Sequence, residues 1–285
     1  MTSDPEGHGD SWSLVRLDAE AFRWQELAQY AFWLRYPAAL DSVRPGQPPG
    51  MEEAAATFRR YGEELNVLEH DLTECLNEFK QSYQVLYREP SAIAKKKFSI
   101  VYHVDNFLIR VHKFRENLYR LLALAVGLDH SGRPRLADSL REERVANALE
   151  RRRFTSIATC VQAFDRDPHI AAAIAARNLF VHQFREDPGR PELEAASRIN
   201  DFEDPIARQV SALTDLPAID RYADRKADDL LRILDAIRDF RNTLYEAIKH
   251  EFVALVSQRS PETRRRFQPF VDAWNAERDL FRLAE

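Results

Sequence analysis

Three polar residues, Arg177, Asn178 and His182, interrupt an otherwise apolar run in the second half of the chain. Histidine has an unperturbed pKa of about 6.5, which makes His182 the natural general base for a ribose 2′-hydroxyl. The guanidinium of Arg177 can stabilise the phosphorane that forms, through two parallel hydrogen bonds. Asn178 could orient His182 or the phosphate. These residue types suit RNA cleavage without a metal, with a 2′,3′-cyclic phosphate as the product.

The flanking sequence predicts that these residues lie late in one helix. Asp167 can cap a helix whose first turn contains Pro168, and the segment 187–189 (Asp-Pro-Gly) breaks the pattern. The helix is expected over about 169–184. Asn178 and His182 are then four residues apart on one face, and Arg177 lies about 100° further round.

The spacing alone is a modest signal. A chain with eight histidines and this many arginines contains about one Arg-x4-His by chance, and an Asn after the Arg lowers the expectation to about 0.03. The alternative interpretation is structural. Cations such as Arg177 and His182 also occur near helix carboxyl ends because they complement the macrodipole and cap free carbonyls.

An RNxxxH motif late in a helix of an all-α bundle resembles the signature of the HEPN superfamily (higher eukaryotes and prokaryotes nucleotide-binding domains). The segment 97–110 also resembles the central helix of some HEPN proteins. The resemblance covers about residues 91–257 and has one specific motif, Arg177-Asn178-x3-His182.

The resemblance implies a metal-independent endoribonuclease that cleaves single-stranded RNA and acts as a homodimer, with both motif copies in one cleft. It also implies a role as a toxin or phage-defence effector, with an antitoxin protein as a further partner. The alternative function is a non-catalytic HEPN-like module that binds nucleotides or proteins, such as the partner of a nucleotidyltransferase-type antitoxin.

Composition predicts an all-α fold, an antiparallel helical bundle with long central helices and shorter accessory helices. Eight glycines in 285 residues are too few for a fold rich in hairpins and tight turns. The two cysteines have no zinc-site spacing and suit a reducing compartment. No stretch reaches about 20 apolar residues, and the amino terminus lacks a secretory pattern, so a cytoplasmic protein is expected. A net charge of −5 argues against general nucleic-acid binding through bulk positive charge.

Apolar spacing and breakers set the expected elements. We expect a disordered tail over 1–16, a helix and Pro-rich linker over 17–50, and a HEPN-like bundle over 51–285 with its core at about 91–257. The segment 189–217 reads as loop with a modest helical piece. Helices are predicted over about 18–36, 51–88, 91–126, 136–153, 155–164, 169–184, 219–257 and 261–281.

Other polar candidates carry less weight. His103 and Arg110 share one face of the central helix, as do Asp105 and His112, and could border a cleft, but buried and satisfied side chains are the favoured interpretation. Arg241-Asn242 repeats the start of the motif without the histidine and is interpreted as a coincidence.

The remaining patterns concern packing and charge. Aromatic residues of the first helix are expected in a core or interface. Clusters at 95–97, 151–153 and 264–266 are basic and could follow a phosphate backbone or be solvated. No phosphate loop or metal-binding motif occurs, so no cofactor or metal is expected.

Overall fold

The structure is a computed structural model that describes residues 23–41, 51–88, 93–128, 142–183 and 205–284. Every secondary-structure element in these ranges is helical and none is a strand, which confirms the predicted all-α bundle. None of the helices in these ranges has the length and apolar character needed to cross a membrane.

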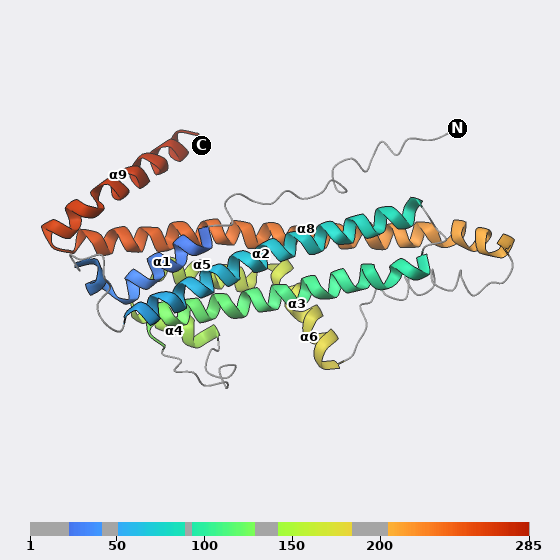
Figure 1. Cartoon of the computed structure of the whole chain (residues 1–285), viewed down its shortest axis with the longest axis horizontal. Coiled ribbons are helices and arrows are strands. Elements are labelled where there is room, and N and C mark those ends of the chain that lie inside the picture. The colour runs from blue at the N-terminus through green and yellow to red at the C-terminus, as the bar shows by residue number, and fades with distance from the viewer. Residues whose placement is uncertain (1–22, 42–50, 89–92, 129–141, 184–204, 285) are drawn as a thin grey trace. The chain divides into compact units, whose positions relative to one another are not determined.

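The helix bounds follow the predicted ones closely for most elements (Figure 1). The long helix predicted over 51–88 is α2, Met51–Arg88, and the central one is α3, Ile93–Val126. The remaining elements are α1 (Arg23–Arg35), the 3-10 helix η2 (Pro37–Asp41), α4 (Glu142–Arg151), α5 (Thr155–Arg166), α6 (Pro168–Gln183), α8 (Pro205–Ser257) and α9 (Pro261–Ala284).

The chain divides into two compact units. Each of the three longest helices, α2, α3 and α8, has one part in the first unit and the other part in the second. Of the described residues, the first unit holds 67–88, 93–116, 164–183 and 205–239, and the second holds 23–41, 51–66, 117–128, 142–163 and 240–284. In the first unit, α2 runs antiparallel to α3, because Asp71 pairs with Arg110 and Glu78 with His103. Its core holds apolar side chains of α2, α3, α6 and α8, among them Leu72, Leu76, Phe79, Phe107, Val111, Ile170, Leu230 and Leu234.

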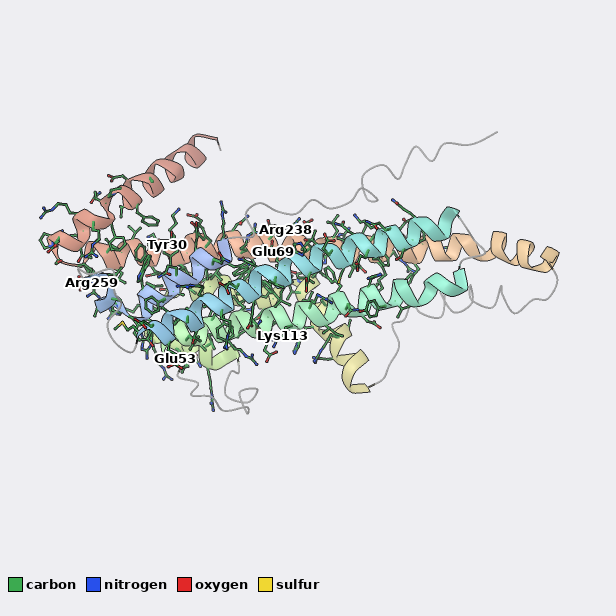
Figure 2. All side chains as sticks on the ribbon, viewed as in Figure 1. Tyr30, Glu53, Glu69, Lys113, Arg238 and Arg259 are labelled. Carbon is green, nitrogen blue, oxygen red and sulfur yellow. The ribbon has the colours of Figure 1, made fainter. Side chains whose placement is uncertain are left out.

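Aromatic side chains form the core of the second unit. Tyr30 and Trp33 of α1 stack on Phe252 of α8, with ring centroids 5.2 and 5.0 Å away, and Phe267 and Phe270 of α9 complete the cluster. This bears out the expectation that the aromatic residues of the first helix are core. It also makes α9 part of this unit's packing. Figure 2 labels Tyr30 among the side chains.

A glycine sets the distance between α1 and α2 in the second unit. A Cβ atom on Gly62 would lie 2.8 Å from the Trp24 carbonyl oxygen and 2.9 Å from the Ala28 Cβ. The two helices therefore touch through backbone and small side chains, an approach that a larger residue at position 62 would prevent.

Two expectations about loops were wrong. The helix expected from position 219 begins at Pro205 and continues through position 217. A proline inside a helix removes one backbone hydrogen bond, and the many other bonds of a 53-residue helix maintain its course. Part of the predicted 37–50 linker is the packed helix η2, where Leu40 is 1% exposed. Asp41 accepts a hydrogen bond from Thr263 Oγ1 (2.7 Å) and pairs with Arg259 (3.3 Å).

Several predictions lie outside the described residues. They are the disordered tail over 1–16, the first part of the helix expected over 18–36, the rest of the linker, the first part of the helix expected over 136–153, the break at 187–189 and the first part of the loop expected over 189–217.

Two helices of the second unit end in the same hydrogen-bonded motif with different residues at its left-handed position. After α3, Leu128 N donates to Ala123 O and Gly127, with φ 74°, occupies that position. After α4, Phe154 N donates to Leu149 O and Arg153, with φ 62°, takes the same place. Glycine is the usual residue there because a Cβ atom is strained at positive φ.

This contrast predicts opposite effects of two substitutions. Arg153→Gly should stabilise the chain by about 1 kcal/mol and raise the Tm by a few degrees, because it relieves the strain of a side chain at positive φ. Gly127→Ala should lower the Tm, because it adds that strain and its Cβ would meet the Arg35 guanidinium. Thermal unfolding followed by circular dichroism measures both; a lower Tm for Arg153→Gly would contradict this account.

Candidate functional site

The motif-bearing helix α6 has a well-defined start. The Asp167 carboxylate accepts hydrogen bonds from the backbone N–H groups of His169 (2.9 Å) and Ile170 (3.0 Å), and Pro168 occupies the first turn. The helix runs to Gln183, so positions 177–182 lie in its last two turns as predicted. Because the helix is continuous there, Asn178 and His182 are one turn apart on the same face.

Arg177 lies at the edge of the buried face of α6. Ile170 (1% exposed) and Ala173 (2% exposed) define that face, and Arg177 follows it at helical spacing, seven residues after Ile170. The guanidinium of Arg177 is half-buried and donates through Nη1 to Asn178 Oδ1 (3.1 Å). Asn178 is exposed. The His182 side chain lies outside the described residues, so the assignment of these three residues as a site stays a prediction.

A second Arg-Asn pair, which the sequence analysis took as coincidence, has a structural role in the second unit. Arg241 of α8 is fully buried, and its Nε donates to Asn242 Oδ1 (3.1 Å). The same oxygen accepts from Arg23 Nη1 of α1 (3.2 Å). The pair therefore joins α1 to α8, whereas Arg177 and Asn178 lie at a surface. The two copies of the dipeptide differ in burial: Arg241 is fully buried, whereas Arg177 is half-buried.

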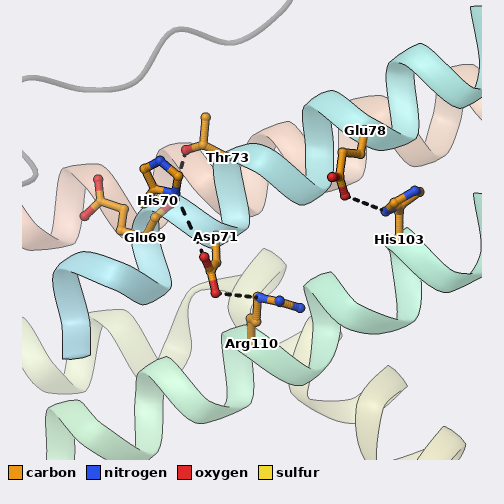
Figure 3. Close-up of polar contacts among 7 residues, drawn as sticks. All are labelled: Glu69, His70, Asp71, Thr73, Glu78, His103 and Arg110. Atoms are coloured by element: carbon orange, nitrogen blue, oxygen red, sulfur yellow. Dashed lines mark hydrogen bonds and ion pairs between the residues drawn. The ribbon is translucent and has the colours of Figure 1, made fainter.

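The polar residues of the central helix α3 form cross-helix pairs with α2 in the first unit (Figure 3). Arg110 Nε donates to Asp71 Oδ2 at 3.1 Å, and His103 Nδ1 lies 3.0 Å from Glu78 Oε2. The His103 side chain is 12% exposed. Burial lowers its pKa from the ordinary value, against the opposing attraction of Glu78. These contacts make Arg110 and His103 part of the packing between α2 and α3 rather than an added part of a cleft.

Sequence reasoning missed a polar seam in the first unit, made by Glu69, Thr73, Asn77 and Lys80 of α2, each at most 8% exposed. Arg238 of α8 lies 3.8 Å from Glu69 Oε1 through Nε and donates to Thr73 Oγ1 at 3.3 Å through Nη2 (Figure 2 labels Glu69 and Arg238). Burial lowers the pKa of Lys80, while nearby carboxylates of α8 oppose the shift. The residues have helical spacing, but a solvated stripe would look the same in sequence.

Within the described ranges, no group of histidine, cysteine and acidic side chains could hold a metal ion. Comparisons of the chain with protein-family models, curated proteins and solved structures find no match. What the chain does must therefore be argued from its own residues.

The burial of His103 predicts a specific pH dependence of stability. Its folded pKa lies below the ordinary value of 6.5, so near that pH the unfolded state binds more protons. The contribution of His103 is therefore complete above about pH 6.5 and falls as the pH drops below it. The Tm of the wild type should fall more between pH 7.5 and 5 than that of His103→Gln. His70→Gln, an exposed histidine on α2, is the control and should keep the wild-type decline. Equal declines for His103→Gln and wild type would contradict a buried neutral imidazole.

Proposed function

We propose that the chain is a HEPN-like, metal-independent endoribonuclease that cleaves single-stranded RNA with Arg177, Asn178 and His182. One observation carries the proposal: the motif occupies the last two turns of α6, where Asn178 is exposed and Arg177 contacts it. The contrast with the Arg241-Asn242 pair, whose arginine is fully buried, supports it, since that dipeptide is used for packing and this one is accessible to a ligand.

The chemistry assigns one task to each side chain. His182 removes the proton of the 2′-hydroxyl, and the freed oxygen attacks the adjacent phosphorus. Arg177 stabilises the charge that develops on the non-bridging oxygens of the phosphorane. Asn178, one turn from His182, holds the imidazole or the phosphate in position. The bond to the 5′-oxygen then breaks, and the products are a 2′,3′-cyclic phosphate and a 5′-hydroxyl.

The leaving 5′-oxygen needs a proton donor, and one copy of the motif has a single imidazole. A homodimer with both α6 helices at one cleft supplies the second, protonated histidine. The dimer, the toxin or phage-defence role and an antitoxin partner belong to the proposal through the HEPN resemblance, and the cytoplasmic location belongs to it through the composition of the sequence.

The second candidate is a non-catalytic helical module that binds a nucleotide or a protein partner. Arg241 and Asn242 favour it, because they show that this chain uses an Arg-Asn dipeptide in helix packing.

Cleavage assays in EDTA separate the two candidates. The wild type should cut a labelled single-stranded RNA and leave a cyclic phosphate terminus. His182→Ala should lower kcat by about 10²- to 10⁴-fold through loss of the base, and Arg177→Ala by about 10²-fold through loss of charge stabilisation. His169→Ala, in the first turns of the same helix, is the matched control and should retain activity. Equal cleavage by wild type and His182→Ala would refute the assignment.

The dimer is tested separately by mixing the wild type with an excess of His182→Ala. A mixed dimer has one imidazole, so it keeps a base for the 2′-hydroxyl but lacks the second histidine that protonates the 5′-oxygen. Co-refolding with a threefold excess of His182→Ala should therefore lower the activity per wild-type chain about fourfold, because only about a quarter of the wild-type chains then pair with each other. Sedimentation velocity checks that the mixture is dimeric. Unchanged activity per wild-type chain in a dimeric mixture would contradict a shared site.

A further inference from the structure

Three helices of the second unit end near one another. Arg35 is the last residue of α1, and its guanidinium contacts the space where a Cβ on Gly127, just after α3, would lie. Arg152 directly follows the last residue of α4. Partial burial lowers the pKa of Arg152, and electrostatic repulsion by Arg35 lowers it further. The end of α1 therefore lies against the end of α3, and Arg152 at the end of α4 is within electrostatic range of Arg35.

This region carries more positive charge than the helix ends require. Each helix carboxyl end is equivalent to about −0.5 of a charge, so three of them offset about 1.5 of the four charges on Arg35, Arg151, Arg152 and Arg153. Counted over the described residues alone, about +2.5 is left over. Among the described residues, no ion pair joins any of these arginines to a carboxylate, including Glu52 and Glu53 at the start of α2 in the same unit.

The acidic residue nearest in sequence is directed elsewhere. Glu150, the only acidic residue between positions 144 and 162, accepts a hydrogen bond from Gln162 Nε2 at 3.5 Å. Arg151, Arg152 and Arg153 are all exposed. A cluster of exposed guanidiniums with a surplus of charge is suited to phosphate, which arginine binds through two parallel hydrogen bonds.

The backbone of Arg153 points to the same conclusion. It has φ 62° in a motif that the chain closes with Gly127 at the neighbouring helix end. Strained residues of this kind are concentrated at binding and catalytic sites. Among the described residues, Arg153 has no ion pair that would offset this strain.

We propose that Arg35, Arg151, Arg152 and Arg153 form a sequence-independent binding site for the phosphodiester backbone of single-stranded RNA. The identity of the ligand rests on the proposed ribonuclease function; the presence of a phosphate-binding site rests on the charge, the exposure and the backbone geometry.

Fluorescence anisotropy with a labelled 20-nucleotide RNA tests the site, with the full chain carrying His182→Ala so that binding is measured without cleavage. In that background, Arg151→Gln with Arg152→Gln should weaken binding about tenfold at 100 mM salt. It should also reduce the slope of log K against log salt by about 0.7 for each arginine lost. Arg153→Gly should weaken binding about threefold while raising the Tm, so its loss of binding cannot be attributed to unfolding.

The matched control is Arg264→Gln with Arg265→Gln on α9, which removes the same charge from an exposed arginine triplet in ordinary helical backbone. Its affinity should stay within twofold of the parent. The inference is overturned if both double variants bind alike at every salt concentration, or if the parent shows no salt-dependent binding. If RNA binding depends on Arg151 and Arg152 but the wild type does not cleave RNA, the proposed ribonuclease function is refuted and the binding site is retained.

Discussion

The packing of α2 in the first unit depends on a buried carboxylate, Glu69, whose charge must be neutralised by a nearby cation. Glu69 is 1% exposed, and a carboxylate at such depth costs several kcal/mol unless a cation and hydrogen-bond donors accompany it. Arg238 provides the cation and also reaches Thr73. Because Arg238 contacts two residues on successive turns of α2, these contacts favour the observed alignment of the two helices. Apolar contacts alone would tolerate several alignments.

Sequence patterns were most informative where the apolar period is long and its ends carry strong signals. The bounds of α2 and the capped start of α6 follow from helical spacing, Asp167 and Pro168. The start of α8 was missed because Pro217 reads as a breaker, while a long helix tolerates the loss of one hydrogen bond. The packing of η2 was missed because its contacts with Arg259 and Thr263 are more than 200 residues distant in sequence.

The candidate site shows a similar limit. The spacing of Arg177 and Asn178 placed them on the last turns of a helix, but only burial separates this dipeptide from Arg241-Asn242, and burial depends on tertiary packing. The pairing of His103 with Glu78 could not be predicted either. The sequence indicated a polar face on α3, but it did not identify which residue of α2 lies opposite. Periodicity identifies which residues share a face; the neighbouring helix decides whether that face is core or surface.

The contact at Gly62 has a consequence for how α1 can move. Where two helices touch through backbone atoms, neither can slide along the other without a collision, because the close fit exists at one position only. Trp24, Tyr30 and Phe32 of α1 are buried in the same arrangement. Release of α1 would therefore be an all-or-none event that exposes Trp24 and Tyr30 together, and indole fluorescence would report it as a single cooperative step.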